Sequence, residues 1–158
     1  MTGQRSKFSR SRLQFVAVLV LLPVVLPLAL IALSMGLAHR AVLYALVWLL
    51  WLPRGKDVLL VHSDSPIWHE YITTQVLPLV QPRAFVLNWS ERKRWPRLSL
   101  PVVVFRSFAG RREFNPLVVV FRPFARARYF RFWQPFQDLK RGYKEPVERS
   151  RQELFAVL

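Results

Sequence analysis

Residues 13–36, LQFVAVLVLLPVVLPLALIALSMG, form an apolar stretch that contains no charged side chain. As an α-helix this stretch would be about 36 Å long, because each helical residue adds about 1.5 Å. The hydrocarbon core of a bilayer is roughly 30 Å thick. The stretch therefore predicts a transmembrane helix and makes the protein membrane-anchored.

A second apolar stretch, residues 37–53, follows the first and begins with the polar pair His39 and Arg40. As a helix it would be about 25 Å long, at the short end for a crossing. Trp48 and Trp51 near its end are typical of a membrane interface. We favour a second transmembrane helix, which would form a helical hairpin with the first. The alternative is an interfacial or core helix behind a single transmembrane helix.

Basic residues lie on both sides of the apolar region. The N-terminal tail, residues 1–12, has four basic residues and no acidic one, whereas residues 54–158 have 19 basic and 9 acidic residues; the whole chain carries a net charge of +15. The positive-inside rule, applied to a hairpin, places both the tail and the basic domain in the cytoplasm. The charge also favours the membrane, with anionic lipid or an acidic protein as partner, and disfavours nucleic acid because the anchor already brings lipid close.

Residues 54–158 suffice for one small domain. Residues 57–62, DVLLVH, predict a buried strand, and apolar residues at helical spacing predict a helix from 66 to about 80. Residues 84–89, AFVLNW, predict a second strand. A strand, a helix and a strand of these lengths indicate a parallel pair with a right-handed crossover.

The sequence VVVFR occurs twice, at residues 102–106 and 118–122. Both copies are rich in β-branched residues, so we expect an antiparallel pair of strands. Residues 91–99 read as a loop or a short helical turn, and residues 148–158 predict a final helix. The fold class is therefore a membrane-anchored α/β protein with a small β-α-β-β-β-α domain.

This order of elements resembles the thioredoxin-like fold over residues 57–158. The resemblance implies that Pro101, just before the third expected strand, matches the cis-proline that this family has there. At the loop where the family carries its redox cysteines, this chain has Ser63-Asp64-Ser65-Pro66, and it contains no cysteine at all. Thiol–disulfide chemistry is thereby excluded. A Rossmann-like half or another α/β sandwich remains the alternative.

Residues 62–70 contain the polar groups that most resemble a site. The end of a strand and the start of a helix can bind anions through free N–H groups, and the weak anion-site candidates there are Ser63, Asp64, Ser65 and His69. We favour the plainer explanation that Ser65 caps the helix and Asp64 complements its dipole. The chain has neither a GxSxG elbow nor a glycine-rich phosphate loop. Two histidines without converging carboxylates do not predict a metal site, so we expect no catalytic residue, metal or cofactor.

The segment FRPFARARYFRFWQPF, residues 121–136, combines arginines and aromatic residues without an acidic residue. Rings that bury in lipid beside guanidinium groups suit a membrane interface. Stacking on single-stranded nucleic acid and packing in the protein core are the alternatives. The expected contacts with lipid or a partner are Arg122, Arg126, Arg128, Phe130, Arg131, Phe132 and Trp133.

These observations favour a non-enzymatic integral membrane protein whose basic domain packs on anionic lipid or docks an acidic partner. A membrane-tethered enzyme that acts on an anionic substrate at residues 62–70 is the first alternative. A membrane-tethered nucleic-acid binder is the second.

Overall fold

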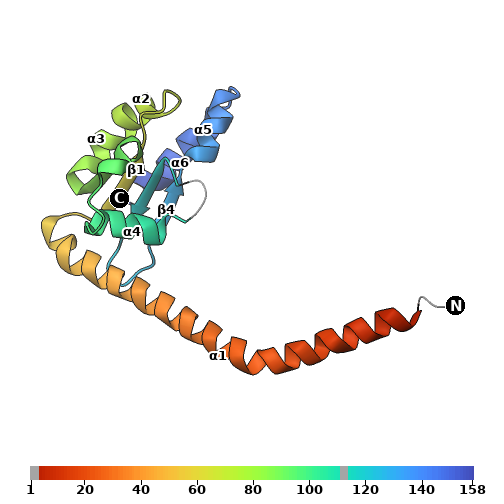
Figure 1. Cartoon of the computed structure of the whole chain (residues 1–158). Helices are drawn as coiled ribbons and strands as arrows, with labels where there is room; N and C mark the ends of the chain where they lie inside the picture. The colour runs from red at the N-terminus through yellow and green to blue at the C-terminus, as the bar shows by residue number, and fades with distance from the viewer. Residues whose placement is uncertain (1–3, 111–113) are drawn as a thin grey trace. The chain divides into compact units, whose positions relative to one another are not determined.

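The computed structural model describes residues 4–110 and 114–158, with side chains from residue 21 onward (Figure 1). The chain divides into two compact units, Met1–Val42 and Leu43–Leu158. The first unit contains the greater part of helix α1, Gln4–Leu50. The second unit contains the last turns of α1 and all the other elements.

Helix α1 is one continuous helix of 47 residues. His39 and Arg40 lie inside it, so the expected hairpin is wrong: the helix continues through the polar pair without a turn. Every side chain from residue 21 to residue 42 is exposed. Within the described part of the chain, Leu21–Arg54 is one helical segment that is long and apolar enough to cross a membrane, judged by length and composition alone.

The last turns of α1 belong to the core of the second unit. Leu43, Val47 and Trp51 are buried, with at most 3% of their surface exposed. Residues four apart lie on one face of a helix, so these three side chains form a single apolar stripe. This is the core helix that the sequence offered as the alternative to a second crossing. The domain therefore begins at Leu43 and not at residue 54.

The second unit is built on a four-stranded mixed sheet with the order β2-β1-β3-β4. Strands β1 and β2 are parallel, with Val58 opposite Ala84, which confirms the predicted parallel pair. Strand β3 is antiparallel to both β1 and β4. The strands are β1 Val58–His62, β2 Ala84–Asn88, β3 Leu117–Val120 and β4 Arg128–Arg131.

The first copy of VVVFR lies in helix α4, Leu100–Phe108, and not in a strand. Pro101 stands in the first turn of α4, where a proline costs no hydrogen bond and its fixed φ suits a helix. The prediction that the two copies pair is therefore wrong, and β3 pairs with β4 instead. The cis peptide bond is Asn115–Pro116, just before β3, and not at Pro101.

A helical stretch connects β1 to β2, close to the predicted range. It changes type along its length, and Thr73 and Thr74 turn their hydroxyl groups back to the carbonyl oxygens of the preceding turn. Pro78 has no N–H to donate, and the helix is widened to the π form just before it. The successive segments are α2 His69–Tyr71, a π-helix Ile72–Val76, α3 Leu77–Val80 and a 3-10 turn Gln81–Arg83.

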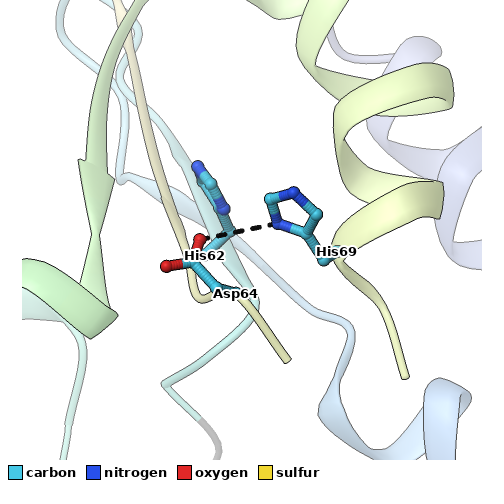
Figure 2. A group of neighbouring side chains, drawn as sticks. All are labelled: His62, Asp64 and His69. Carbon is cyan, nitrogen blue, oxygen red and sulfur yellow. Dashed lines mark ion pairs between the residues drawn. The ribbon is translucent and has the colours of Figure 1, made fainter. Parts of the chain in front are cut away.

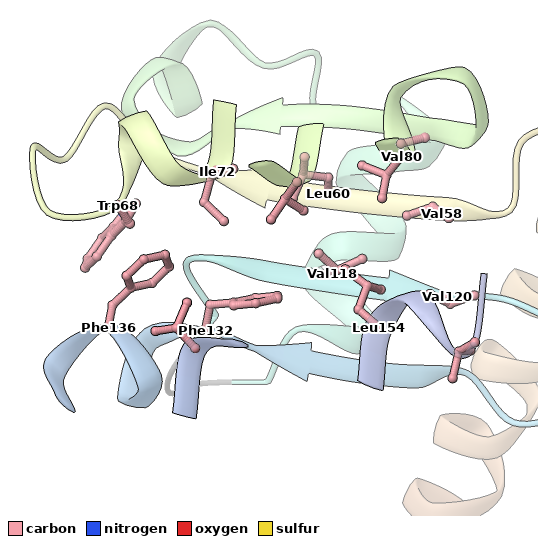
Figure 3. Packing of buried hydrophobic residues seen from close by; sticks show 14 residues of the cluster. Val58, Leu60, Trp68, Ile72, Val80, Val118, Val120, Phe132, Phe136 and Leu154 are labelled. Carbon is pink, nitrogen blue, oxygen red and sulfur yellow. The ribbon is translucent and has the colours of Figure 1, made fainter. Parts of the chain in front are cut away.

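Each face of the sheet carries its own apolar core. Alternate residues of a strand point to opposite faces, so Leu60 and Val118 enter one core while Leu59 and Val119 enter the other. The first core is covered by the helical stretch after β1 and by α5, Trp133–Lys140, and α6, Glu145–Phe155 (Figure 3).

The second core is covered by α4 and by the last turns of α1. Two 3-10 turns, Leu52–Arg54 and Trp89–Arg94, connect these helices to the sheet. The second turn overlaps the segment 91–99, which was expected to be a loop or a short helical turn. The domain therefore has three layers, with helices on both faces of the sheet.

Candidate functional site at the end of strand β1

The polar residues 62–70 lie where β1 ends, beside the end of β2. His62 is paired with Asn88 as the last pair of the parallel ladder. Ligands of α/β sheets commonly bind outside the carboxyl ends of parallel strands. The fold therefore puts these residues at a position where a site can form.

Ser63 is a buried structural residue. Its Oγ accepts hydrogen bonds from Trp68 Nε1 at 3.1 Å and from Asn115 Nδ2 at 2.8 Å. These two bonds connect the end of β1 to the helical stretch and to the segment before β3. Neither of these two partners, among the described residues, is a general base of the kind that activates a serine nucleophile.

Asp64 is held by residues at the end of β2 and not by a helix. Its N–H donates to Ser90 Oγ at 3.0 Å, and its Oδ1 accepts from Asn88 Nδ2 at 2.9 Å. Asn88 Oδ1 in turn accepts from the Ser90 N–H. The carboxylate is therefore oriented by a small network of neutral polar groups.

Ser65 does not cap a helix, so that prediction is wrong. Helix α2 begins at His69, and its N-cap residue is Trp68, whose side chain makes no capping bond. The carbonyl oxygen of Ser65 instead accepts from the N–H groups of Trp68 and His69. The helix therefore begins about one helical turn later than the sequence pattern predicts, and this later start determines the position of His69.

His62, Asp64 and His69 converge at this turn (Figure 2). One ligand atom of each lies within 4.8 Å of those of the other two. His69 Nδ1 is 3.6 Å from Asp64 Oδ1, and the two imidazole rings are 6.0 Å apart between centroids. Burial lowers the pKa of His62 from its ordinary value, and the neighbouring His69 lowers it further, while Asp64 and a hydrogen bond of the ring to the Ser63 backbone oppose this.

Sequence reasoning considered His62 and His69 together as metal ligands but rejected them for lack of a converging carboxylate, and it assigned Asp64 to a helix dipole. The signal that was available is the spacing, with a carboxylate two residues after one histidine and five before the next. What was missing is the turn, because a helix beginning at residue 66 would place His69 elsewhere. Of the four anion-site candidates, only Asp64 and His69 come together as partners.

A cavity of about 220 Å³ lies beside Ser63. Asn115 contributes to its wall and has a buried Oδ1 without a hydrogen-bond partner among the described residues. The other lining residues are aromatic: Trp68, Trp89, Phe114 and Trp133. Trp133, a residue expected to contact lipid, thus lines this cavity.

The arginine–aromatic segment does not form a single surface. Phe132 is fully buried in the first core, and Phe130 packs against that core. Arg131 donates from Nη2 to the Ala109 carbonyl oxygen and is half-buried. On strand β4, Arg128 and Arg131 point to opposite faces of the sheet, because they are three residues apart. These positions correspond to the core interpretation that the sequence left open.

The exposed part of the arginine–aromatic segment lies in the loop between β3 and β4. Phe124 is 93% exposed and has a positive φ of 57°. Its ring centroid is 5.4 Å from that of Trp48, on the last turns of α1. Arg126 is exposed on the same loop. The Ala127 N–H donates to Tyr44 Oη at 2.8 Å, which fastens the loop to α1.

Comparison of the chain with family models, with curated proteins and with solved structures gives no significant match.

Proposed function

We propose that the protein is a single-pass membrane protein whose α/β domain lies against anionic lipid through the β3–β4 loop and has no enzymatic role. The observation that carries this proposal is the contact of the exposed Phe124 with Trp48, with the exposed Arg126 two residues further along the same loop. Trp48 lies on the last turns of α1, which belong to the same compact unit as the loop. Lipid contact is therefore assigned to a small part of the segment 121–136.

The anchor is supported by exposure. Leaving one large apolar side chain in water forgoes about 1.5–3 kcal/mol relative to burying it. The side chains of residues 21–42 are all exposed, and half of these residues are leucine, valine or isoleucine. A bilayer would bury them, and the described protein does not. Since the domain begins at Leu43 with no linker, it would start at the membrane surface.

The loop has the composition of a membrane interface. Tryptophan and other aromatic rings concentrate at the level of the lipid headgroups, where arginine meets phosphate. Phe124, almost fully exposed, gains nothing from the protein core beyond its contact with Trp48. Arg126 adds about 1 kcal/mol if it lies near an anionic surface.

A single crossing helix places the N-terminal tail and the domain on opposite sides of the membrane. The expectation of two cytoplasmic ends depended on the hairpin. The tail has four basic residues near the span, and the other flank has three, Arg40, Arg54 and Lys56. The rule counts charges close to the span and is insensitive to long domains. A difference of one charge does not decide between the two orientations.

We also propose that the domain is a thioredoxin-like fold without redox chemistry. The support is the pairing: a parallel β1–β2 pair joined by a helix, then an antiparallel β3–β4 pair added to the β1 edge, in the order β2-β1-β3-β4. Along the chain, helix α4 lies between the parallel pair β1–β2 and the antiparallel pair β3–β4. A thioredoxin-like fold has a helix at this position. The absence of cysteine leaves such a fold as a binding scaffold.

The test places a spin label at Phe124 in the full-length protein, which is cysteine-free and so needs a single change, Phe124→Cys. In nanodiscs with anionic lipid, we expect the label to be more accessible to oxygen, which partitions into lipid, than to a water-soluble relaxation agent. Arg126→Gln should reduce this difference, and so should salt, because screening shortens the reach of a charge to about 8 Å at 0.15 M.

The control label is at Tyr143→Cys. Tyr143 is 66% exposed and lies between α5 and α6, which cover the opposite face of the sheet from the last turns of α1. It should be accessible to the water-soluble agent alone. If the labels at 124 and 143 were equally accessible to the water-soluble agent, the proposal that the loop contacts lipid would be wrong. Protection at 124 only when an acidic protein or a single-stranded nucleic acid is added would favour the other proposed partners.

A further inference from the structure

We propose that His62, Asp64 and His69 bind one divalent transition-metal ion, with zinc as the first candidate. The three side chains come from the end of β1, the turn after it and the first residue of α2 (Figure 2). An ion there would fasten the strand to the helical stretch. This inference is independent of the lipid contact proposed above.

The distances are close to those of a metal site. Nitrogen and oxygen ligands lie about 2.0–2.2 Å from zinc, so two ligands of a tetrahedral ion are about 3.3–3.5 Å apart. His69 Nδ1 and Asp64 Oδ1 are 3.6 Å apart, too far for a good hydrogen bond. The third ligand atom lies within 4.8 Å of both. Small rotations of the side chains would therefore complete the ligand set.

The unpartnered nitrogens supply a second, independent observation. His62 is only 7% exposed, and its Nδ1 has no hydrogen-bond partner among the described residues. His69 Nδ1 is likewise buried without a hydrogen bond. Leaving a buried polar group unpaired costs about 1–3 kcal/mol. A bound ion would satisfy both nitrogens at once.

Asp64 already has the outer support that metal ligands usually need. Hydrogen bonds from groups that touch the ligands, but not the ion, fix the orientation of the ligands and tune the ion. Asn88 Nδ2 donates to Asp64 Oδ1, and Ser90 Oγ accepts from the Asp64 N–H. The carboxylate is thus held in place before any ion binds, while 52% of its side chain remains exposed to solvent.

The ligand set selects the kind of ion. Two imidazoles and one carboxylate suit zinc and its neighbours among the divalent transition metals, whereas magnesium and calcium prefer oxygen ligands alone. Imidazole binds metal in its neutral form, and burial favours that form at His62. Three protein ligands leave a fourth position for water, as in zinc sites that act as Lewis acids.

The experiment measures binding of Zn²⁺ by titration calorimetry and of Co²⁺ by visible absorption, using the full-length protein in detergent. We expect one ion per chain and the intense visible bands of tetrahedral Co²⁺. Asp64→Asn and His69→Asn change partly exposed side chains and keep their approximate shapes. Each should weaken Zn²⁺ binding by about tenfold or more, given that loss of even an outer-shell partner weakens metal sites by about 10–100-fold.

The matched control is His39→Asn, because His39 is the one other histidine of the chain and lies on α1. It should leave Zn²⁺ affinity unchanged. Circular dichroism establishes that each variant is folded before it is titrated. Absence of Zn²⁺ binding by the wild-type protein, or equal loss in His39→Asn and Asp64→Asn, would overturn the site.

Discussion

The five residues VVVFR occur twice in different structures, once within helix α4 and once beginning in strand β3. The copy at residues 102–106 is helical, whereas the copy at 118–122 begins in the centre of the sheet and ends in the loop after β3. In α4, Val103 is half-buried and Arg106 is exposed; in β3, Val118 to Val120 are all buried. An identical local sequence therefore has two outcomes, and local propensity does not choose between them.

The neighbours of each copy account for the difference. Ser99 and Pro101 precede the first copy and suit the start of a helix, with Ser99 as the N-cap residue. The second copy begins in β3, whose two edges pair with β1 and β4 and whose two faces lie in the two apolar cores. A strand buried on both faces has a continuous apolar run. The same run on a helix leaves part of its circumference toward solvent.

Replacing the middle valine of each copy by aspartate should give the largest difference in stability between the strand and the helix. Val119 is fully buried in the second core, so Val119→Asp would bury an unpaired charge. We expect a loss of about 4 kcal/mol or more in the free energy of unfolding, enough to unfold the domain. Val103→Asp, on the partly exposed side of α4, should leave a folded protein. Circular dichroism in detergent distinguishes the two, and two folded variants would contradict this account of β3.

Replacing the same valines by alanine should give a smaller difference in unfolding free energy between the two copies. Val119→Ala removes two buried methyl groups and leaves a cavity, which should cost about 2–3 kcal/mol of unfolding free energy. Val103→Ala should cost less than about 1 kcal/mol, because alanine is the better helix former and the side chain is only half-buried. Denaturant unfolding of the full-length protein measures both. Equal losses would mean that Val103 is as tightly packed as Val119.

Replacing the arginine of each copy by alanine should give the smallest difference in unfolding free energy. Arg122 donates from Nη2 to the Val157 carbonyl oxygen and so holds the C-terminus, whereas Arg106 is exposed on α4. Arg122→Ala should cost about 1 kcal/mol of stability, the usual value of one hydrogen bond. Arg106→Ala should stay within about 0.5 kcal/mol of wild type. If Arg106→Ala proves the more destabilising, α4 depends on that side chain in a way its exposure does not indicate.

The parts of the fold that were predicted correctly are those with strong local patterns. Residues 57–62 and 84–89 are short apolar runs separated by a helical pattern, and their parallel pairing follows from that order. The copy of VVVFR at 118–122 was predicted as a strand, and its three valines do lie in β3. The prediction of a strand at 102–106 was wrong, because a short apolar run fits a buried helix as well as a strand.

The candidate site was predicted only as a list of residues. Asp64 and His69 were named, but they were assigned to an anion site and a helix cap. Their approach to His62 depends on α2 starting at His69, which the capping pattern placed one turn earlier. Phe132 and Trp133 were expected at a surface; Phe132 is fully buried, whereas Trp133 is exposed and lines a cavity.

Composition and periodicity were enough to predict an apolar helix near the N-terminus and a basic α/β domain after it. The absence of cysteine was enough to exclude thiol chemistry. Tertiary structure decided that α1 continues into the core of the domain, since burial of Leu43, Val47 and Trp51 requires the sheet to be present. It also decided which VVVFR copy became a strand and which histidines met a carboxylate. These outcomes depend on contacts between residues distant along the chain, and no local pattern specifies such contacts.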